Sequence, residues 1–355
     1  MHEAAAIFEA MPGAIERARD VLTSAAISST AARWDSAPVA ALSAAAERGA
    51  DVRVLLDGFG EWYSLKRAST LLPRHTVSRF ARFPPPRLFP PSFSVNLRNH
   101  RKILLVDGVD GVHGRHQHSR PLSGPRTPTH RRLRTTAERA RCSRRSRPCS
   151  CAIGSSSPGN GTVALSRAAP AGGADAASSR TAPAADLDRL TALLIGAIAS
   201  ARRRVAIMTP YFVPPRELIS PLQAAALAGV DVAVILPGAQ QPAVRPSGAR
   251  ATCRGSCSSA ACNVYYQPPP FVHSKLFYVD DHYAQIGSAN FDSRSLRLNF
   301  EMNVEVYDAT AVTELATHFE AIRERSRRVT LAEADGRPFL TRTIDGVAWL
   351  FSPYL

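Results

Sequence analysis

Apolar residues in the first part of the chain recur with two different periods. Residues 14–22 and 38–48 place them three and four positions apart, the spacing of an amphipathic helix, and Gly49 directly follows the second segment. Residues 51–56 alternate between polar and apolar positions instead, which predicts a strand. We therefore expect helices that lead into a strand of a sheet.

The same order returns in the second half of the chain. Residues 187–202 have a helical pattern and lead into an apolar strand at 205–209. Residues 222–228 are again helical, Gly229 ends them, and a strand is expected at 231–236. This internal repetition predicts an α/β fold built from two copies of one helix-and-strand unit.

One histidine, one lysine and one aspartate recur at identical spacing in each half. The two sets are His100, Lys102 and Asp107, and His273, Lys275 and Asp280. An apolar run between each lysine and aspartate predicts a buried strand, and proline clusters at 84–86 and 268–270 mark loops before the motifs. Two copies are a far more specific signal than one, because a single set of three residues arises by chance in many proteins.

These residue types suit the chemistry of a phosphodiester. Residues two apart on a strand face the same way, so each histidine projects together with its lysine. The ammonium group neutralises anionic oxygens, while the imidazole can attack phosphorus or carry a proton. Each aspartate lies on the opposite side of its strand, and we assign it to holding the loop beyond the motif.

Composition adds limits to this interpretation. A chain of 355 residues with 45% hydrophobic content can bury a large core. It contains no apolar stretch long enough to cross a bilayer, and its first residues lack the pattern of a signal peptide. We expect a cytoplasmic protein that lies peripherally on the inner face of the cell membrane. The net charge of +15 comes mostly from residues 115–150, so it does not by itself indicate a lipid or nucleic-acid partner.

Two stretches break the α/β pattern. Residues 115–180 are dominated by Arg, Ser, Pro, Ala and Gly without apolar periodicity, and positions 115–150 alone hold eleven arginines against one acid, Glu138. Residues 239–262 are similarly irregular, and all six cysteines lie in the two stretches without the spacing of a zinc site. Because three lysines beside many arginines suggest a GC-rich gene, we hypothesise that both stretches arose from a shifted reading frame; a disordered basic linker is the alternative.

The two motifs and the sequence Gly-Ser-Ala-Asn at 287–290 resemble the phospholipase D superfamily. Segments 96–102, 209–214 and 267–273 are similar to bacterial cardiolipin synthases. The resemblance implies two α/β/α sandwich lobes related by a pseudo-twofold axis, with one active site at the lobe interface. We expect a first lobe at 1–114, the anomalous segment at 115–185 and a second lobe at 186–355.

The resemblance also implies a reaction. One histidine attacks phosphatidylglycerol to form a phosphohistidine, the other protonates the departing glycerol, and a second lipid alcohol then displaces the enzyme, with no metal or other cofactor. In this family the first histidine is the usual nucleophile, which is His100 here and leaves His273 as acid and then base. Lys102, Lys275 and Asn290 would hold the phosphate oxygens, Ser288 matches the family spacing, and Glu301 stands where a carboxylate orients a histidine ring.

The first half departs from the family after Gly114. Arg115, His116 and Gln117 stand where an asparagine ligand belongs, and Pro128 stands where the second orienting acid belongs. We therefore expect severely reduced or absent turnover from this exact chain. The alternative functions are a phospholipase D-type hydrolase, a nuclease, and a catalytically dead protein that binds membranes. Apolar segments at 210–214 and 268–272 argue against a nuclease, because such lips of a site suit acyl chains.

Overall fold

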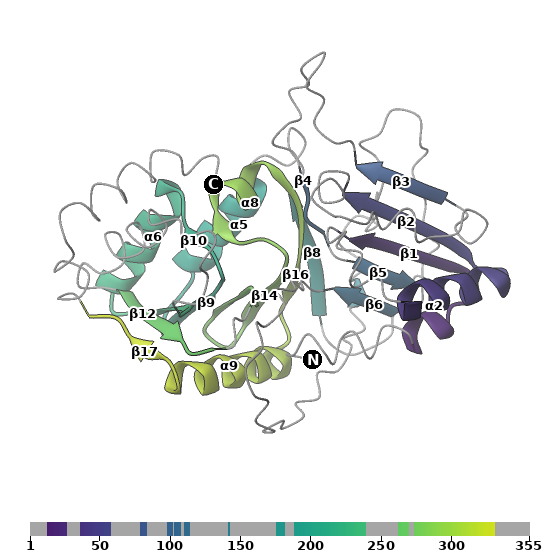
Figure 1. Cartoon of the computed structure of the whole chain (residues 1–355). Helices are drawn as coiled ribbons and strands as arrows, with labels where there is room; N and C mark the ends of the chain where they lie inside the picture. Colours follow the sequence, from purple (N-terminus) through teal and green to yellow (C-terminus); the bar gives the residue numbers. More distant parts are fainter. Residues whose placement is uncertain are drawn as a thin grey trace, which may run out of the picture. The chain divides into compact units, whose positions relative to one another are not determined.

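The computed structural model describes part of the chain in detail. The described residues are 13–26, 36–57, 79–83, 98–101, 103–107, 110–113, 141–142, 175–181, 188–238, 262–269 and 273–330. Two compact units are present, one formed by residues 1–95 and 101–173 and the other by residues 96–100 and 174–355. Each unit is described by itself below, with the element labels of Figure 1.

The first unit contains a sheet of five strands in the order β3-β2-β1-β5-β6. Its strands are β1 (Val21–Ala26), β2 (Asp51–Asp57), β3 (Arg79–Phe83), β5 (Ile103–Val106) and β6 (Asp110–His113). Strands β1, β2 and β3 are parallel, whereas β5 runs antiparallel to both β1 and β6. The unit also contains helix α2 (Ser36–Glu47) and the short strand β7 (Arg141–Cys142).

Local sequence explains most of the first unit. Gly49 adopts a φ of 94°, which a glycine tolerates best, and it turns the chain from α2 into β2. In β2 the side chains of Val52, Val54 and Leu56 are buried, as the alternation predicted. The expected helix at 14–22 is wrong beyond its first turn: helix covers residues 13–16, and Val21 already belongs to β1. Pairing with β2 and β5 overrides the helical pattern there.

The second unit contains a larger sheet. Its strands follow one another in the order β17-β12-β11-β9-β13-β14-β16-β8, and β4 also pairs with β16. These strands are β4 (Arg98–Asn99), β8 (Asp175–Thr181), β9 (Arg204–Met208), β11 (Asp231–Pro237), β12 (Cys262–Gln267), β13 (Leu276–Val279), β14 (Tyr283–Gly287), β16 (Asn299–Val306) and β17 (Arg327–Arg328). A separate pair is formed by β10 (Phe212–Val213) and β15 (Phe291–Asp292).

The strand order of the first unit is repeated in the second. Strands β12, β11 and β9 are parallel, and β13 runs antiparallel to β9 and β14, just as β3, β2, β1, β5 and β6 are arranged. Gly229, which precedes β11, has a φ of 90° and thus corresponds to Gly49, which precedes β2. The two units therefore contain the same sheet topology, as the internal sequence repetition predicted.

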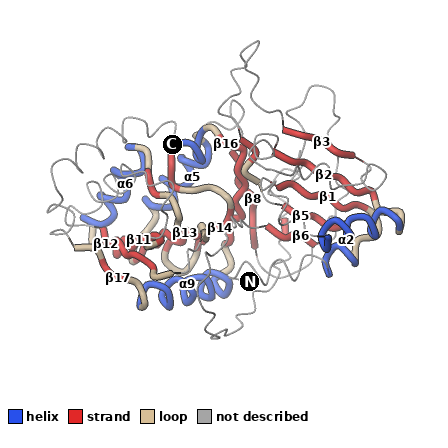
Figure 2. The backbone as a smooth tube through the Cα atoms, viewed as in Figure 1, coloured by secondary structure: helices blue, strands red, loops and turns tan. Residues whose placement is uncertain are grey.

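Helices cover both faces of the central strands in the second unit. Helices α5 (Arg189–Ala199) and α6 (Arg216–Leu227) pack on the face that includes Val205 and Phe277, and α9 (Ala309–Glu324) packs on the face that includes Met208 and Tyr278. Figure 2 shows the strands between these helices. This layering confirms the predicted α/β class, and it explains why β9, β11 and β13 are apolar on both faces.

Helix α6 begins earlier than the sequence predicted. Helix α6 begins at Arg216 and continues through Pro221, although proline normally interrupts a helix. Leu218 and Leu222 on either side are both fully buried, so packing outweighs the lost hydrogen bond. Strand β8 begins near the end of the irregular stretch 115–180, where no strand was expected, and it pairs antiparallel with β16. Within the described residues, no helix is both long and apolar enough to cross a membrane.

Candidate active site

The aspartates of the two motifs tie neighbouring parts of the sheet together. Asp280 accepts hydrogen bonds from the backbone N–H groups of Arg202, Arg203 and Arg204 at 2.7–3.0 Å. Burial disfavours the charge of Asp280, but these three bonds outweigh it and hold its pKa below the usual value. The carboxylate thus holds the turn before β9, rather than the loop beyond the motif, because β13 ends beside the start of its antiparallel neighbour.

Asp107 does the same in the first unit. Its carboxylate accepts from the backbone N–H groups of Arg19 and Asp20 at 2.8–3.3 Å, in the turn before β1. Asp107 and Asp280 also share a positive φ of 51°. Both aspartates belonged to the predicted site, and the structure places each of them in a structural turn.

His273 and Lys275 lie together immediately before β13. Their side chains are buried, and Lys275 Nζ lies 2.5 Å from His273 Nδ1 and 2.8 Å from the His273 carbonyl oxygen. An ammonium group can only donate, so the imidazole Nδ1 must accept from it. The proton of the neutral ring is then on Nε2.

The turn at 287–290 is joined tightly to β16. The Ser288 hydroxyl accepts from Met302 N at 3.0 Å and lies 3.2 Å from Met302 O, so it bonds the backbone of the neighbouring strand. Ala289 N donates to Asn303 Oδ1. A Cβ on Gly287 would lie 2.5 Å from Met302 O and 2.6 Å from Asn303 Cα, which explains why glycine occupies this position.

Strand β16 presents buried polar side chains on one face. Asn299, Glu301, Asn303 and Glu305 alternate with less buried residues and are all at least nine-tenths buried. Asn299 Nδ2 donates to Glu301 Oε1 at 3.1 Å. This alternation of acids and amides along a strand was the sequence signal that could have identified Asn299 and Asn303, which our sequence reasoning missed.

Glu301 contacts the histidine of the first motif. Strand β4 pairs in parallel with the start of β16, and His100 N donates to Phe300 O at 2.9 Å, which places the His100 ring beside this strand. The distance from His100 Nδ1 to Glu301 Oε1 is 2.8 Å, and the carboxylate is completely buried. Because the carboxylate accepts, Nδ1 of His100 carries a proton, and the lone pair of the neutral ring is on Nε2.

Asn290 is held by a short helix that follows it. Its Nδ2 lies 3.2 Å from Ser295 Oγ, and both side chains are buried. Helix α8 (Ser293–Arg297) begins after Asp292, whose carboxylate accepts from Ser295 N at 2.6 Å. The helix cap therefore fixes the hydroxyl that contacts Asn290.

Segment 210–214 differs from the apolar lip that we predicted. Phe212 and Val213 are almost fully buried, because β10 pairs with β15 and Phe212 packs against Phe291. Tyr211 contacts the motif, with its ring centroid 5.9 Å from that of His273 in an edge-on arrangement. The lip prediction is wrong for Phe212 and Val213, and Tyr211 is a site residue that we missed.

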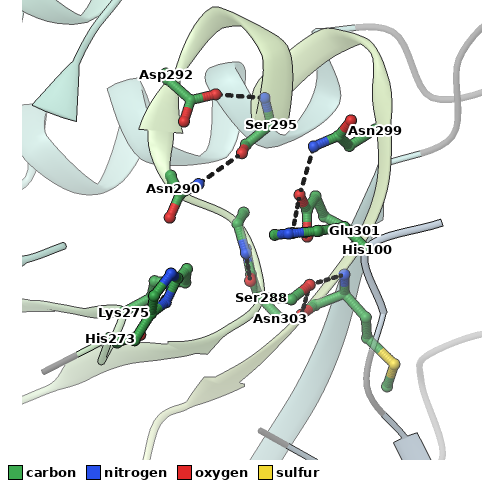
Figure 3. A network of polar contacts seen from close by, with 12 residues as sticks. His100, His273, Lys275, Ser288, Asn290, Asp292, Ser295, Asn299, Glu301 and Asn303 are labelled. Atoms are coloured by element: carbon green, nitrogen blue, oxygen red, sulfur yellow. Dashed lines mark hydrogen bonds and ion pairs between the residues drawn. The ribbon is translucent and has the colours of Figure 1, made fainter. Parts of the chain in front are cut away.

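Figure 3 shows how these side chains gather. The His100 ring lies beside Glu301 on one side, the His273 and Lys275 pair lies on the other, and Asn290 lies above that pair. Lys102 and the divergent positions 115–117 and 128 lie outside the described residues. The prediction that no metal takes part stays a prediction.

Comparison with known proteins agrees with this arrangement. A family model described as "Cardiolipin synthase, PLD-like domain" matches residues 194–323. Cardiolipin synthase A of Pseudomonas putida (strain GB-1) is 30% identical over 365 residues, which cover 99% of this chain and 73% of the relative. The chain belongs to the cardiolipin synthase family of the phospholipase D superfamily. The sequence predicted this superfamily.

Other cardiolipin synthases and a solved structure extend the comparison. The major cardiolipin synthase of Bacillus subtilis (strain 168) is 32% identical over 89% of this chain, and the chain spans 62–66% of the length of the first curated relatives it matches. The crystal structure of phosphatidylserine synthase from Haemophilus influenzae has a TM-score of 0.68 at 14% identity and covers 100% of this chain and 94% of that chain. This last likeness supports the fold.

Proposed function

We propose that the chain is a phosphatidyl transferase that acts on phosphatidylglycerol through a phosphohistidine intermediate, as a cardiolipin synthase does. The single observation that carries this proposal is that the Nδ1 atoms of the two histidine rings have partners of opposite charge. His100 Nδ1 faces a carboxylate, whereas His273 Nδ1 faces an ammonium group. One ring is therefore prepared to attack, and the other is prepared to donate a proton.

The reaction begins at His100. Its Nε2 lone pair attacks phosphorus, and the bond from phosphorus to the glycerol oxygen breaks. The proton on His273 Nε2 goes to that oxygen while the Lys275 ammonium gives a proton to His273 Nδ1, so the ring stays neutral. Glu301 stabilises the positive ring that forms when His100 becomes phosphorylated. Lys275 and Asn290 hold the non-bridging oxygens, and family membership extends the lysine role to Lys102.

The second half of the reaction reverses the proton transfer. The hydroxyl group of a second phosphatidylglycerol attacks the phosphohistidine, His273 Nε2 accepts its proton, and the bond from phosphorus to His100 breaks. The products are cardiolipin and free enzyme. Because positions 115–117 supply no asparagine to mirror Asn290, we expect this turnover to be slow.

We also propose a location for this chemistry at an anionic membrane surface, on the inner face of the cell membrane. The arginines at positions 115–150, which supply most of the net charge of +15, support a nonspecific attraction to anionic phosphatidylglycerol. Salt weakens this attraction, because it screens charges beyond a Debye length. Sedimentation with phosphatidylglycerol vesicles at low and high salt checks this location. Binding that is equal for neutral phosphatidylcholine vesicles would contradict it.

The activity test compares two substrates. Purified protein is incubated with phosphatidylglycerol vesicles, and glycerol release, cardiolipin formation and acid-labile phosphohistidine are measured; single-stranded DNA is tested in parallel. His100→Ala should abolish the phosphohistidine, whereas His282→Ala, which removes an exposed histidine, should not. Absence of glycerol release and of phosphohistidine in a single turnover would refute the proposal, and nicking of DNA instead would favour a nuclease.

A further inference from the structure

The hydroxyl group of Ser295 is placed to control the direction in which Asn290 presents its carboxamide. Ser295 is 1% exposed and Asn290 is 5% exposed, and their side chains lie 3.2 Å apart. The position of Ser295 is fixed from two directions. Asp292 accepts from its backbone N–H, and β15, which leads into α8, pairs with β10.

One end of the Asn290 carboxamide is unsatisfied in this arrangement. Its nitrogen donates to Ser295 Oγ, but its buried oxygen has no hydrogen-bond partner among the described residues. In Figure 3 this oxygen points to the side on which His273 and Lys275 lie. A buried acceptor without a donor is costly, so something must meet it or the group must turn.

A rotation of the carboxamide by 180° resolves both ends. The carboxamide occupies the same volume after the rotation, because its oxygen and nitrogen are nearly the same size. The Ser295 hydroxyl can then donate to the Asn290 oxygen, since a hydroxyl group both donates and accepts. The two amide protons of Asn290 would face the histidines, where they attract a phosphate oxygen that the carbonyl oxygen would repel.

We propose that Ser295 is a positioning residue that turns the Asn290 amide toward the phosphodiester by changing from acceptor to donor. This inference rests on the proposed function, because it takes a phosphodiester as the ligand. Because the Asn290 carboxamide occupies the same volume before and after the rotation, it can respond to an anion without a movement of the backbone. Ser295 itself does not touch the substrate.

Nuclear magnetic resonance of the side-chain amide tests this role without turnover. The Asn290 amide signals are identified by their loss in Asn290→Ala, and inorganic phosphate is then titrated into the full-length protein. In the wild type these signals should shift as phosphate binds. In Ser295→Ala phosphate should bind about tenfold more weakly, the effect of losing one hydrogen bond, and Ser295→Cys should fall between the two.

A matched control separates positioning from folding. Ser326→Ala removes a hydroxyl that bonds Ile322 O on α9, outside the site, and it should leave the phosphate titration unchanged. Thermal unfolding of each variant confirms that it is folded. Equal phosphate affinity in wild type and Ser295→Ala, or no shift of the Asn290 signals in the wild type, would overturn the inference. If Ser295→Ala weakens phosphate binding but phosphatidylglycerol gives neither glycerol release nor phosphohistidine, the proposed function is overturned, and Ser295 still orients Asn290 toward a phosphate.

Discussion

Replacing Glu301 by glutamine changes the charge beside His100 but almost none of the volume. The two carboxylate oxygens of Glu301 now accept from His100 Nδ1 at 2.8 and 3.0 Å, and Asn299 donates to one of them at 3.1 Å. Glutamine has one oxygen for these two donors. If that oxygen faces Asn299, the glutamine N–H group faces His100, and the ring must move its proton to Nε2, where it blocks the attacking lone pair.

The size of the effect follows from the burial of the pair. Coulomb's law gives roughly 6 kcal/mol for unit charges 2.8 Å apart at an effective dielectric constant of about 20. Desolvation of the carboxylate and the remaining hydrogen bond offset more than half of this value. About 2–3 kcal/mol of transition-state stabilisation should be lost, which lowers the single-turnover rate by roughly 30- to 150-fold.

The assay is glycerol release from phosphatidylglycerol vesicles with enzyme in excess over substrate. Glu305→Gln is the matched control, because Glu305 is a buried acid on the same face of β16 that bonds Tyr307 instead of a motif histidine. A Glu301→Gln rate within about threefold of the wild type, below the predicted range, would refute the reasoning. An equal loss in Glu305→Gln would show that the effect comes from the strand and not from the charge beside His100.

Three further substitutions test the scaffold of the site. Gly287→Ala should destabilise the protein by about 1–3 kcal/mol in denaturant unfolding, because its Cβ meets the β16 backbone; an unchanged midpoint would contradict the close approach. Asp280→Asn should lower the free energy of unfolding by about 1–2 kcal/mol at pH 7 and by less in acid. Folding lowers the pKa of Asp280, so its carboxylate stabilises the fold at pH values above the usual pKa of 3.8, and this stability is lost as the pH falls through the pKa of the folded state. A cost that does not change with pH would contradict this. Tyr211→Leu should lower the glycerol-release rate about tenfold, whereas Tyr211→Phe should preserve it, because the aromatic ring and not the hydroxyl group contacts His273. Equal rates in the two variants would show that this ring contact does not affect the reaction.

The sequence by itself determined one strand in each unit, the glycines that end the helices and the repetition of the unit. Residues 51–56 and 231–236 form strands as predicted, because alternation or continuous burial of apolar residues is a local pattern that needs no knowledge of the partner strand. The histidine and lysine pair of the second motif also lies together as predicted, because two residues of separation bring side chains to one side.

Only the tertiary structure decided which acid contacts which histidine ring and which apolar residues are buried in the core. Glu301 lies 201 positions from His100, and no local pattern carries the pairing of β4 with β16 that joins them. The same holds for Phe212, which sequence alone cannot distinguish from an exposed lip until β10 meets β15. The sequence shows which side chains can do chemistry, but the charged groups that contact them depend on the pairing of strands that lie far apart in the chain.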